Sequence, residues 1–364
     1  MIKLDGSYME GGGALVRTAL ALSALTSKPF EVNKIRSGRP NQGLKAQHLT
    51  SIKALKEICN AKTSDIELGT TEFWFHPGKI KRGIYEFDIG TAGSITLFLQ
   101  AIILPCLFAP GKITLKVKGG TCGKWQASVD YLQNVLIPQL TRFVEKMELK
   151  VLKRGYYPKG GGEIQLEINP RFKLNEYENF SQFSEDLRYK TVKINLVEQG
   201  EIEQIRGNIN ASSDLSEMEV AERIKKSAEN SLKEFNVPIN IRTEYKNTLS
   251  VGGEIVLWAL FSKDGKMDFD NPTILGADSL IEKGKSSEQI GKEVSDKLKV
   301  EINSAAAVDR YLADQLIPFM ALLPESIIKS REISKHAQTN IYVTEQFLEI
   351  GFIIKNNTIL TEEK

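Results

Sequence analysis

The chain has 364 residues, of which 41% are hydrophobic and 26% are charged, a globular composition that excludes long disordered or fibrous segments. Its length exceeds the usual size of a single core, so we expect one large domain with a smaller one attached, or two comparable domains. The formal charge of +2 excludes a strongly basic chain, so any surface for nucleic acid has to be a local patch.

Three apolar helical segments, each opened by a run of small residues, recur along the chain. A short strand-like run and a second helical segment follow each of them. This repetition predicts an α/β fold built from repeated helix–sheet units whose helices stack together. The segments in chain order are helix 14–25, strand 30–35 and helix 44–59, then helix 95–107, strand 113–117 and helix 128–147, and finally helix 308–323, strand 326–329 and helix 337–347.

The third unit starts much further from the second than the second does from the first, which leaves room for an inserted domain. Polar segments at both ends of these extra residues indicate the limits of the inserted domain. We expect residues 1–182 and 286–364 to form a large catalytic domain and residues 183–285 a small inserted α+β domain. Its expected elements are strand 191–196, helix 217–235, strand 239–243 and strand 254–261.

Two glycine-rich turns, Glu10 to Gly13 and Gly90 to Ser94, open the first two units. Such turns either permit close packing or present backbone N–H groups and the positive end of a helix dipole to a phosphate. Arg17 lies one turn into an otherwise apolar helix. A guanidinium there requires an anionic partner, which is either a bound phosphate or a buried carboxylate.

Two further loops are rich in glycine and cations. Residues 36–43 lie in the acid-free stretch 34–53, and their arginines either present forked donors to phosphate or belong to a solvated loop. Residues 155–162 form a tight turn that is either structural or an anion-binding edge.

The chain has three histidines. We expect His76, which precedes a proline, to be structural. His48 either makes a local hydrogen bond or lines a site. His336 opens the last helical segment, where it serves either as a cap or surface residue or as a catalytic group. Without Cys, Asp or Glu at ligand spacing, the histidines do not predict a zinc site.

The three cysteines show neither metal-ligand nor disulfide spacing, which indicates reduced thiols and a cytoplasmic protein. The N-terminal residues 1–7 lack a signal-peptide pattern. The most apolar run, residues 95–110, is short and interrupted, so no membrane contact is expected. The sequence carries no indication of oligomeric state.

Taken together and in order, seven segments resemble the RNA 3'-terminal phosphate cyclase family over nearly the whole chain. The resemblance rests on the order of several motifs and not on one of them. The segments are Leu4 to Gly13 with Arg17, Ile35 to Arg39, Gly43 to His48, Gly90 to Ser94, Gly155 to Gly162, Tyr311 to Gln315 and His336 to Asn340.

The resemblance implies a large domain of repeated α/β units, an architecture shared with enolpyruvyl transferases, and a smaller inserted α+β domain. It also implies an ATP-dependent reaction in which a histidine takes AMP from ATP and passes it to an RNA 3'-terminal phosphate. The neighbouring 2'-hydroxyl then closes a 2',3'-cyclic phosphodiester and expels AMP. His336 stands at the position of the nucleophile. ATP, a divalent metal (Mg²⁺ or Mn²⁺) and RNA with a 3'-terminal phosphate are the implied cofactors and partner.

The resemblance further implies roles for individual residues, namely Glu10 at the metal, Arg17, Arg39 and Gln47 at the phosphates, and Gln100, Tyr311, Asp314 and Gln315 at the nucleotide. One segment, residues 122–128, departs from the family by lacking its proline-containing stretch. There, Trp125 is a candidate to replace the lost stacking surface.

Two other hypotheses remain open from the sequence. A noncatalytic cyclase-like protein would bind RNA or ribosome-assembly partners with the same fold, but such proteins lack the nucleophilic histidine. An enolpyruvyl transferase shares the repeated architecture and binds phosphate, but it does not account for a histidine at position 336. His336 therefore favours the cyclase over both alternatives.

Overall fold

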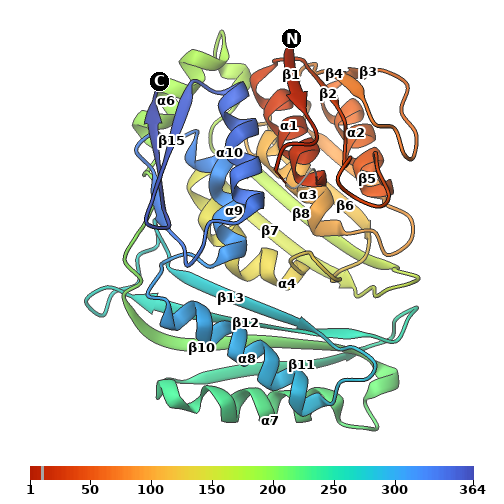
Figure 1. Ribbon diagram of the computed structural model, residues 1–364, viewed down its shortest axis with the longest axis vertical. Coiled ribbons are helices and arrows are strands. Elements are labelled where there is room, and N and C mark those ends of the chain that lie inside the picture. Colours follow the sequence, from red (N-terminus) through yellow and green to blue (C-terminus); the bar gives the residue numbers. More distant parts are fainter. Residues whose placement is uncertain (10–11) are drawn as a thin grey trace.

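The structure is a computed structural model that describes residues 1–9 and 12–364. Figure 1 shows a larger upper part, which holds both chain termini at its far end, and a smaller lower part. In the described part of the chain, the named strands form four sheets of four strands each, three in the upper part and one in the lower. Within the same residues, no helix combines the length and the apolar character needed to cross a membrane.

The three upper sheets repeat one topology, in which two strand–helix pairs are followed by two further strands. In each sheet the first strand pairs parallel with the second, the second antiparallel with the fourth, and the fourth antiparallel with the third. The predicted repeat is therefore confirmed.

The first unit contains β1 (Ile2–Asp5), α1 (Gly13–Thr26), β2 (Phe30–Asn33), α2 (Ala46–Cys59), β3 (Lys62–Thr63) and β4 (Phe73–His76). The second contains β5 (Gly83–Asp88), α3 (Ile95–Cys106), β6 (Ile113–Gly119), α4 (Val129–Tyr131) with its continuations η1 (Leu132–Leu136), α5 (Ile137–Leu140) and η2 (Thr141–Phe143), β7 (Val144–Lys153) and β8 (Gly162–Pro170). The third contains β9 (Asn195–Leu196), α9 (Arg310–Met320), β14 (Ile327–Lys329), α10 (Lys335–Phe347), β15 (Ile350–Lys355) and β16 (Thr358–Glu363). The turn η3 (Leu174–Glu176) and α6 (Phe180–Lys190) connect the second unit to the third.

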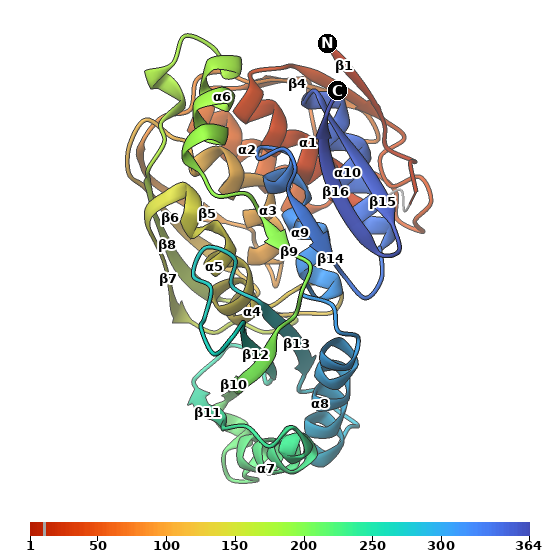
Figure 2. The same cartoon turned by 90° about the vertical axis from the view of Figure 1, so that its left-hand side faces the viewer.

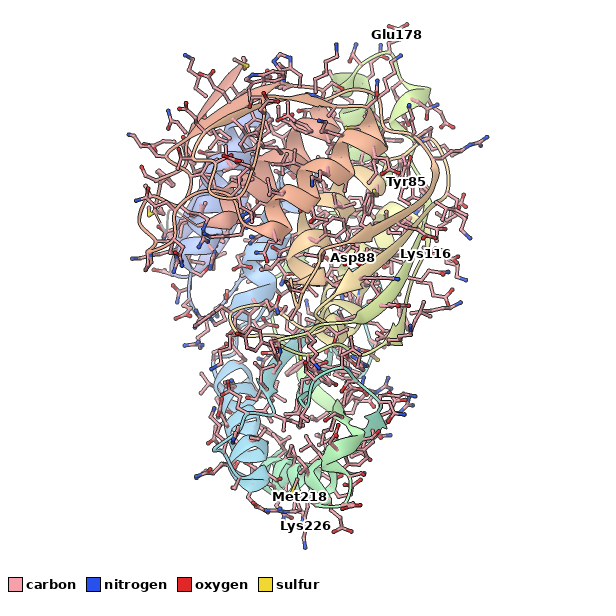
Figure 3. All side chains as sticks on the ribbon, turned by 90° about the vertical axis from the view of Figure 1, so that its right-hand side faces the viewer. Tyr85, Asp88, Lys116, Glu178, Met218 and Lys226 are labelled. Atoms are coloured by element: carbon pink, nitrogen blue, oxygen red, sulfur yellow. The ribbon has the colours of Figure 1, made fainter. Side chains whose placement is uncertain are left out.

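The helices of the three units pack on one another in the interior, with α1 at the centre. Every residue of α1 is buried, and the helix contacts α2, α3 and α10. Its sequence is apolar on nearly every face, which is the pattern of a helix surrounded by protein. The outer faces of the sheets carry charged side chains, such as Lys116 of β6, which forms an ion pair with Glu86 at 2.8 Å (Figure 3).

The lower part is a single sheet with two helices on one face (Figure 2). Its strand order is β11-β10-β12-β13, and the helices α7 and α8 cover a second hydrophobic core. In α7 the buried apolar residues recur every three to four positions, as an amphipathic helix requires. The elements are β10 (Glu201–Ser212), η4 (Ser213–Leu215), α7 (Val220–Leu232), η5 (Lys233–Phe235), β11 (Ile239–Lys246), β12 (Gly253–Ser262), β13 (Ile274–Leu280) and α8 (Ser287–Asn303).

Two expected elements are wrong. The helix expected over 128–147 ends at Phe143, because the chain from Val144 onward pairs with β8 as β7. The strand expected to open the inserted domain, residues 191–196, instead gives β9, which pairs with β14 of the third unit. The third unit therefore begins before the insertion, and its first strand is separated from its first helix by the whole lower part.

The packing of α8 bears on the limits of the inserted domain. Its apolar residues join the second core, and it contacts α7, β12 and β13. We therefore propose that the inserted domain runs from β10 through α8, which moves its end from residue 285 to Asn303.

A buried polar cluster joins the lower sheet to the second unit. The guanidinium of Arg154 donates to both carboxylate oxygens of Asp130 and, at 3.3 Å, to Glu254 of β12. Asn208 of β10 donates to the same Asp130 at 3.0 Å. Beside this cluster, apolar residues of β12 and β13, among them Trp258, pack into the core of the upper part. The two parts are thus fixed together by both apolar and polar contacts.

Candidate active site

The first turns of several helices meet at the centre of the upper part. At Gly13, the first residue of α1, a Cβ atom would lie 2.2 Å from Nε2 of His48 on α2 and 3.0 Å from Nη1 of Arg17. No larger residue fits there, so glycine allows α1 and α2 to approach. Arg17 in turn donates from Nε to Oε1 of Gln100 on α3 at 2.9 Å. The start of α1 is therefore linked to both α2 and α3.

Further hydrogen bonds add α9 and α10 to the same place. The hydroxyl of Thr18 on α1 donates to Oδ1 of Asn340 on α10 at 2.8 Å. The amide of Asn340 then donates to the backbone carbonyl of Asp314 on α9 at 2.8 Å. The beginnings of helices carry unsatisfied N–H groups and the positive end of the helix dipole. A place where several of them converge favours the binding of an anion.

His48 is buried and contributes a donor to this place. Its Nδ1 accepts a hydrogen bond from the backbone N–H of Lys45 at 3.0 Å, so the proton of the neutral ring is on Nε2. Among the described residues, Nε2 has no hydrogen-bond partner. Burial lowers the pKa of His48 to about 3, with contributions from the charges of Arg17, Arg36 and Lys45, so the ring is neutral at physiological pH. The local hydrogen bond that the sequence allowed is confirmed, and Nε2 lies beside Gly13 at the start of α1.

Asp314 and His336 lie on neighbouring helices and interact electrostatically. His336 is the second residue of α10, whose first turn is capped by Ser334 accepting from the backbone N–H of Ala337 at 2.9 Å. Burial raises the pKa of Asp314 to about 7, against the opposing influence of the charges on His336 and Arg17. Arg17, Asp314 and His336 therefore share one electrostatic environment.

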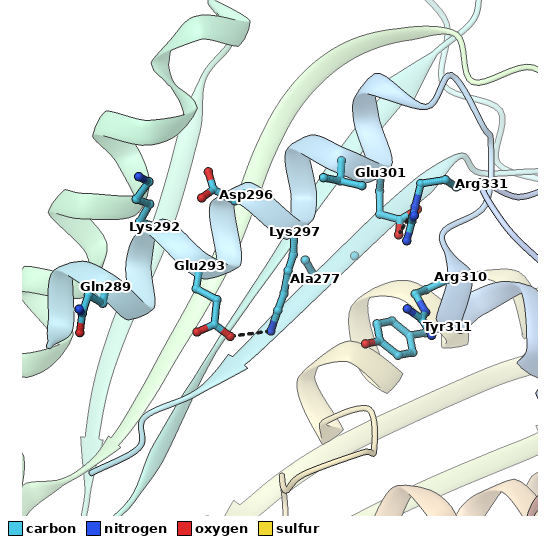
Figure 4. Close-up of a pocket in the computed structure, with 12 residues that line it drawn as sticks. Ala277, Gln289, Lys292, Glu293, Asp296, Lys297, Glu301, Arg310, Tyr311 and Arg331 are labelled. Atoms are coloured by element: carbon cyan, nitrogen blue, oxygen red, sulfur yellow. Dashed lines mark hydrogen bonds and ion pairs between the residues drawn. The ribbon is translucent and has the colours of Figure 1, made fainter. Parts of the chain in front are cut away.

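Tyr311 faces a pocket of about 640 Å³ between α8 and the start of α9 (Figure 4). Its ring packs edge-on against Tyr131, with the centroids 6.3 Å apart, and lies under the guanidinium of Arg310. Burial raises the pKa of the Tyr311 phenol. Gln315, one turn further along α9, donates to the carbonyl of Tyr311 at 2.9 Å. Tyr311 thus offers a partly open ring at the edge of a pocket, three residues from Asp314.

The pocket is lined by α8, β13 and α9, and it does not include Arg17, Gln100 or His336. Several of its charged side chains form ion pairs with one another. Lys297 contacts Glu293 at 3.0 Å and Arg331 contacts Glu301 at 3.3 Å. The pocket and the convergence of helix starts are therefore adjacent but distinct, and α9 contributes to both.

The remaining predicted residues differ in their burial and position. Gln47 is half-buried next to His48 on α2, whereas Arg39 is exposed in the loop between β2 and α2. Glu10 lies outside the described residues. The side chain of Trp125 is 96% exposed, and the ring that packs on Tyr311 is Tyr131 instead.

Sequence reasoning missed several contributors to the site. Asn340 had a place in a motif but no role, although its position four residues after His336 puts both on one face of a helix. Asp309 caps α9 by accepting from the backbone N–H groups of Tyr311 and Leu312, each at 2.9 Å, and it also accepts from the hydroxyl of Tyr131. An Asp directly before a helical segment is a capping pattern that the sequence displays.

These features define an α/β protein of repeated units whose helix starts bring together Arg17, His48 and His336. Residues 8–354 match the family described as RNA 3'-terminal phosphate cyclase. Similar curated proteins carry the name RNA 3'-terminal phosphate cyclase. One from Pyrococcus furiosus is 40% identical, with 98% of this chain and 95% of the relative aligned. One from Methanosarcina acetivorans is 39% identical over 100% of this chain and 99% of the relative. The chain belongs to the RNA 3'-terminal phosphate cyclase family of enzymes.

Proposed function

We propose that this protein converts the 3'-terminal phosphate of RNA to a 2',3'-cyclic phosphodiester at the expense of ATP, with His336 carrying AMP between the two substrates. Membership of the cyclase family supports the overall reaction. The observation that carries the site assignment is the convergence of Arg17, His48, Asp314 and His336, each within the first two turns of one of four packed helices.

The first step needs a nucleophile close to stabilised phosphate oxygens. In the proposal a ring nitrogen of His336 attacks the α-phosphorus of ATP. A P–N bond forms, the P–O bond to the β-phosphate breaks, and pyrophosphate leaves. Arg17 and the Nε2–H group of His48 are the donors placed to stabilise charge on the phosphate oxygens. Asp314 lies close enough to His336 to hold the ring in orientation.

Two further displacements complete the cycle. An oxygen of the RNA 3'-phosphate attacks the phosphorus of the AMP group, the P–N bond to His336 breaks, and the RNA end becomes an anhydride with AMP. The adjacent 2'-hydroxyl then attacks the RNA phosphorus, loses its proton to a base and expels AMP. The charge that develops on phosphorus-bound oxygens is the same in kind at every step, so one cationic site serves all three.

In this proposal Tyr311 and Gln315 contact the nucleotide from the pocket between α8 and α9. A half-exposed aromatic ring at a pocket edge provides a face on which a base stacks. Gln100 fixes the guanidinium of Arg17. Arg39 and Gln47 come from the segment just before and within α2 and approach the phosphates from that side.

A divalent metal is also part of the proposal, with Mg²⁺ or Mn²⁺ as candidates. Among residues 1–9 and 12–364, no group of three or more metal-ligating side chains occurs. Mg²⁺ bound to nucleotides typically takes only one or two carboxylates, with phosphates and waters as the other ligands. A single carboxylate such as Glu10 is compatible with that mode. When bound, the ion would neutralise charge on the phosphate oxygens.

We also place the protein in the cytoplasm, because its three cysteines are free and buried.

The test is covalent labelling with ATP that is radioactive in its α-phosphate, in the presence of Mg²⁺. The wild type should retain acid-labile, alkali-stable label, and His336→Ala should retain none. His76→Ala is the matched control, because His76 is exposed on β4 and should leave labelling intact. EDTA should abolish the label. Equal labelling of wild type and His336→Ala would show that another residue is the nucleophile. A folded wild type that takes no label would favour a noncatalytic binding protein.

A further inference from the structure

We infer that a polar groove on the lower part binds the RNA strand upstream of its reacting 3' end. This inference rests on the proposed function. The groove has a volume of about 330 Å³ and lies between η1 of the second unit and the edge of the lower sheet formed by β10 and β11. It is lined by Gln133, Asn134, Gln204, Arg206, Gly207, Asn208, Asn240, Arg242 and Trp258.

Strand register places the charged and polar side chains of the groove on one face of the sheet. Arg206 of β10 lies directly opposite Asn240 of β11 and Trp258 of β12. Asn208, two residues further along, lies opposite Arg242. Because side chains two apart point to the same side of a strand, all five project from the face opposite α7 and α8. The groove is thus built into the pairing of the sheet.

The two arginines of the groove are available to an anion. Arg206 and Arg242 are exposed, and no described carboxylate lies within ion-pair distance of either. Among the described residues, their one side-chain hydrogen bond runs from Nε of Arg206 to Oε1 of Gln204 at 2.9 Å, which leaves the terminal nitrogens of the Arg206 guanidinium to a ligand. Within the part of the chain that the structure describes, no Asp or Glu lines the groove. Two guanidinium groups in this setting are suited to phosphates, which they contact in bidentate fashion.

The pocket at Tyr311 differs from the groove in the charges of its lining residues. It carries both acidic and basic residues, and its Lys297 and Arg331 are already paired with carboxylates at 3.0 and 3.3 Å. A polyanion entering it would have to compete with those pairs. The groove has cations without anions, and it is therefore the better site for the backbone of a nucleic acid.

The uncharged residues of the groove suit RNA more than an inorganic anion. Five of them are amides, and Asn240 makes no side-chain hydrogen bond with the described part of the protein. Amide groups both donate and accept, so they match base edges and the 2'-hydroxyl groups that distinguish RNA from DNA. Asn134 and Asn208 are held in place by Asp130, through its carbonyl at 2.8 Å and its carboxylate at 3.0 Å respectively.

The position of the groove predicts which nucleotides it contacts. The groove is at the β11 edge of the sheet, whereas the Tyr311 pocket is at the β13 edge. Strands lie about 4.8 Å apart, so the width of the sheet alone separates the two by roughly 14 Å. At about 3.4 Å for each nucleotide, a stacked strand covers that distance with about four nucleotides. A stacked RNA therefore has to be longer than this to reach the groove.

The experiment compares Arg206→Ala/Arg242→Ala with wild type on two RNAs ending in a 3'-phosphate, one of about twelve nucleotides and one of three. For the long RNA, KM should rise about tenfold or more, since two charge-assisted contacts are lost. The slope of log affinity against log salt should become shallower by about 1.4, as expected for two phosphate contacts on a single strand. For the three-nucleotide RNA, KM should not change.

Two controls separate this inference from the function on which it rests. Lys226→Ala/Lys233→Ala removes the same charge from exposed positions on or next to α7, on the other side of the lower part, and should leave both KM values unchanged (Figure 3). Labelling by ATP should be equal in all variants, because the groove takes no part in that step. If labelling itself fails in the wild type, the proposed function is at fault and not the groove.

Other outcomes overturn the inference. An unchanged KM for the long RNA would exclude the groove as an RNA site. Equal increases for both RNAs would place the effect of the arginines at the reaction centre. If inorganic phosphate protects the wild type but not the variant against thermal unfolding while KM for RNA is unaffected, the groove is a site for free anions only.

Discussion

Arg17 and Arg154 are two buried arginines in different parts of the molecule. Each is 8% exposed. The guanidinium of Arg154 meets the carboxylates of Asp130 and Glu254, on segments that join the upper and lower parts. Arg17 meets the neutral amide of Gln100 and the neutral ring of His48, at the starts of packed helices. A buried arginine between carboxylates on two parts of the molecule holds the structure together, whereas Arg17 stands at the helix starts where the phosphates are proposed to bind.

The carboxyl groups around Arg154 are themselves unequal. Burial would raise the pKa of Asp130, but the Arg154 guanidinium holds it below its usual value. Burial raises the pKa of Glu254 well above its usual value, and the charge of Asp130 adds to this. Arg154 thus favours the charged form of Asp130, whereas burial favours the neutral form of Glu254.

The largest effect expected from this comparison is on stability. Arg154→Met should lower the free energy of unfolding by about 3–5 kcal/mol, because it leaves the charge of Asp130 buried without a partner. Chemical denaturation at neutral pH measures the loss. A loss below about 1 kcal/mol would mean that the cluster does not join the two parts of the molecule.

Arg17→Gln should act mainly on the reaction. The rate of AMP-adduct formation should fall by about 10²–10³, the usual effect of removing one donor to developing charge. Single-turnover labelling measures this rate. Arg171→Gln is the matched control, since Arg171 is exposed and stacks only on Phe172. An adduct rate within tenfold of wild type would remove Arg17 from the phosphate site.

The raised pKa of Asp314 predicts that the stability of the fold depends on pH, an effect smaller than that of Arg154→Met. Its folded pKa of about 7 exceeds its usual value of 3.8, so the folded state holds a proton that the unfolded state releases between these values. Its contribution to stability therefore falls as pH rises from about 4 to about 7 and stays low above that. Asp314→Asn should be more stable than wild type at pH 8 by about 1–3 kcal/mol, with no difference near pH 3.5. Thermal unfolding across this range would contradict the account if the variant were the less stable at pH 8.

The smallest effect concerns Glu254. Because burial raises the pKa of Glu254 and so favours its neutral form, the isosteric Glu254→Gln change should alter the stability at pH 7 by at most about 1 kcal/mol, on the stabilising side. Denaturation alongside Asp130→Asn provides the comparison, since Asp130 is the charged member of the pair. Similar large losses for both variants would show that both carboxylates are ionised.

The repeated units were predictable because each rests on local patterns. The apolar run of α1 and the small residues before α1, α3 and α9 are contiguous in sequence. The role of β9 was not predictable, because this two-residue strand pairs with β14 across more than a hundred intervening residues. Long-range packing also explains the position of α8. Its amphipathic pattern predicts a helix but does not indicate on which core the helix packs.

In the candidate site, too, some residues could be expected from the sequence, whereas other contacts depend on how the helices pack. Arg17, Gln100, Asp314 and His336 were expected from the resemblance to the family, and the structure brings them to neighbouring helix starts. The orphaned Nε2 of His48 and the bridge from Thr18 through Asn340 depend on how α1, α2 and α10 pack, which no local pattern records. The groove at Arg206 and Arg242 likewise depends on the register between β10 and β11.

The most direct test of the central claim uses RNA whose 3'-terminal phosphate is radioactive. With ATP and Mg²⁺, the wild type should make this label resistant to phosphatase, with release of one AMP for each RNA end protected, whereas His336→Ala should leave the label fully sensitive. A wild-type protein that forms its AMP adduct but leaves the RNA phosphate sensitive to phosphatase would contradict the account.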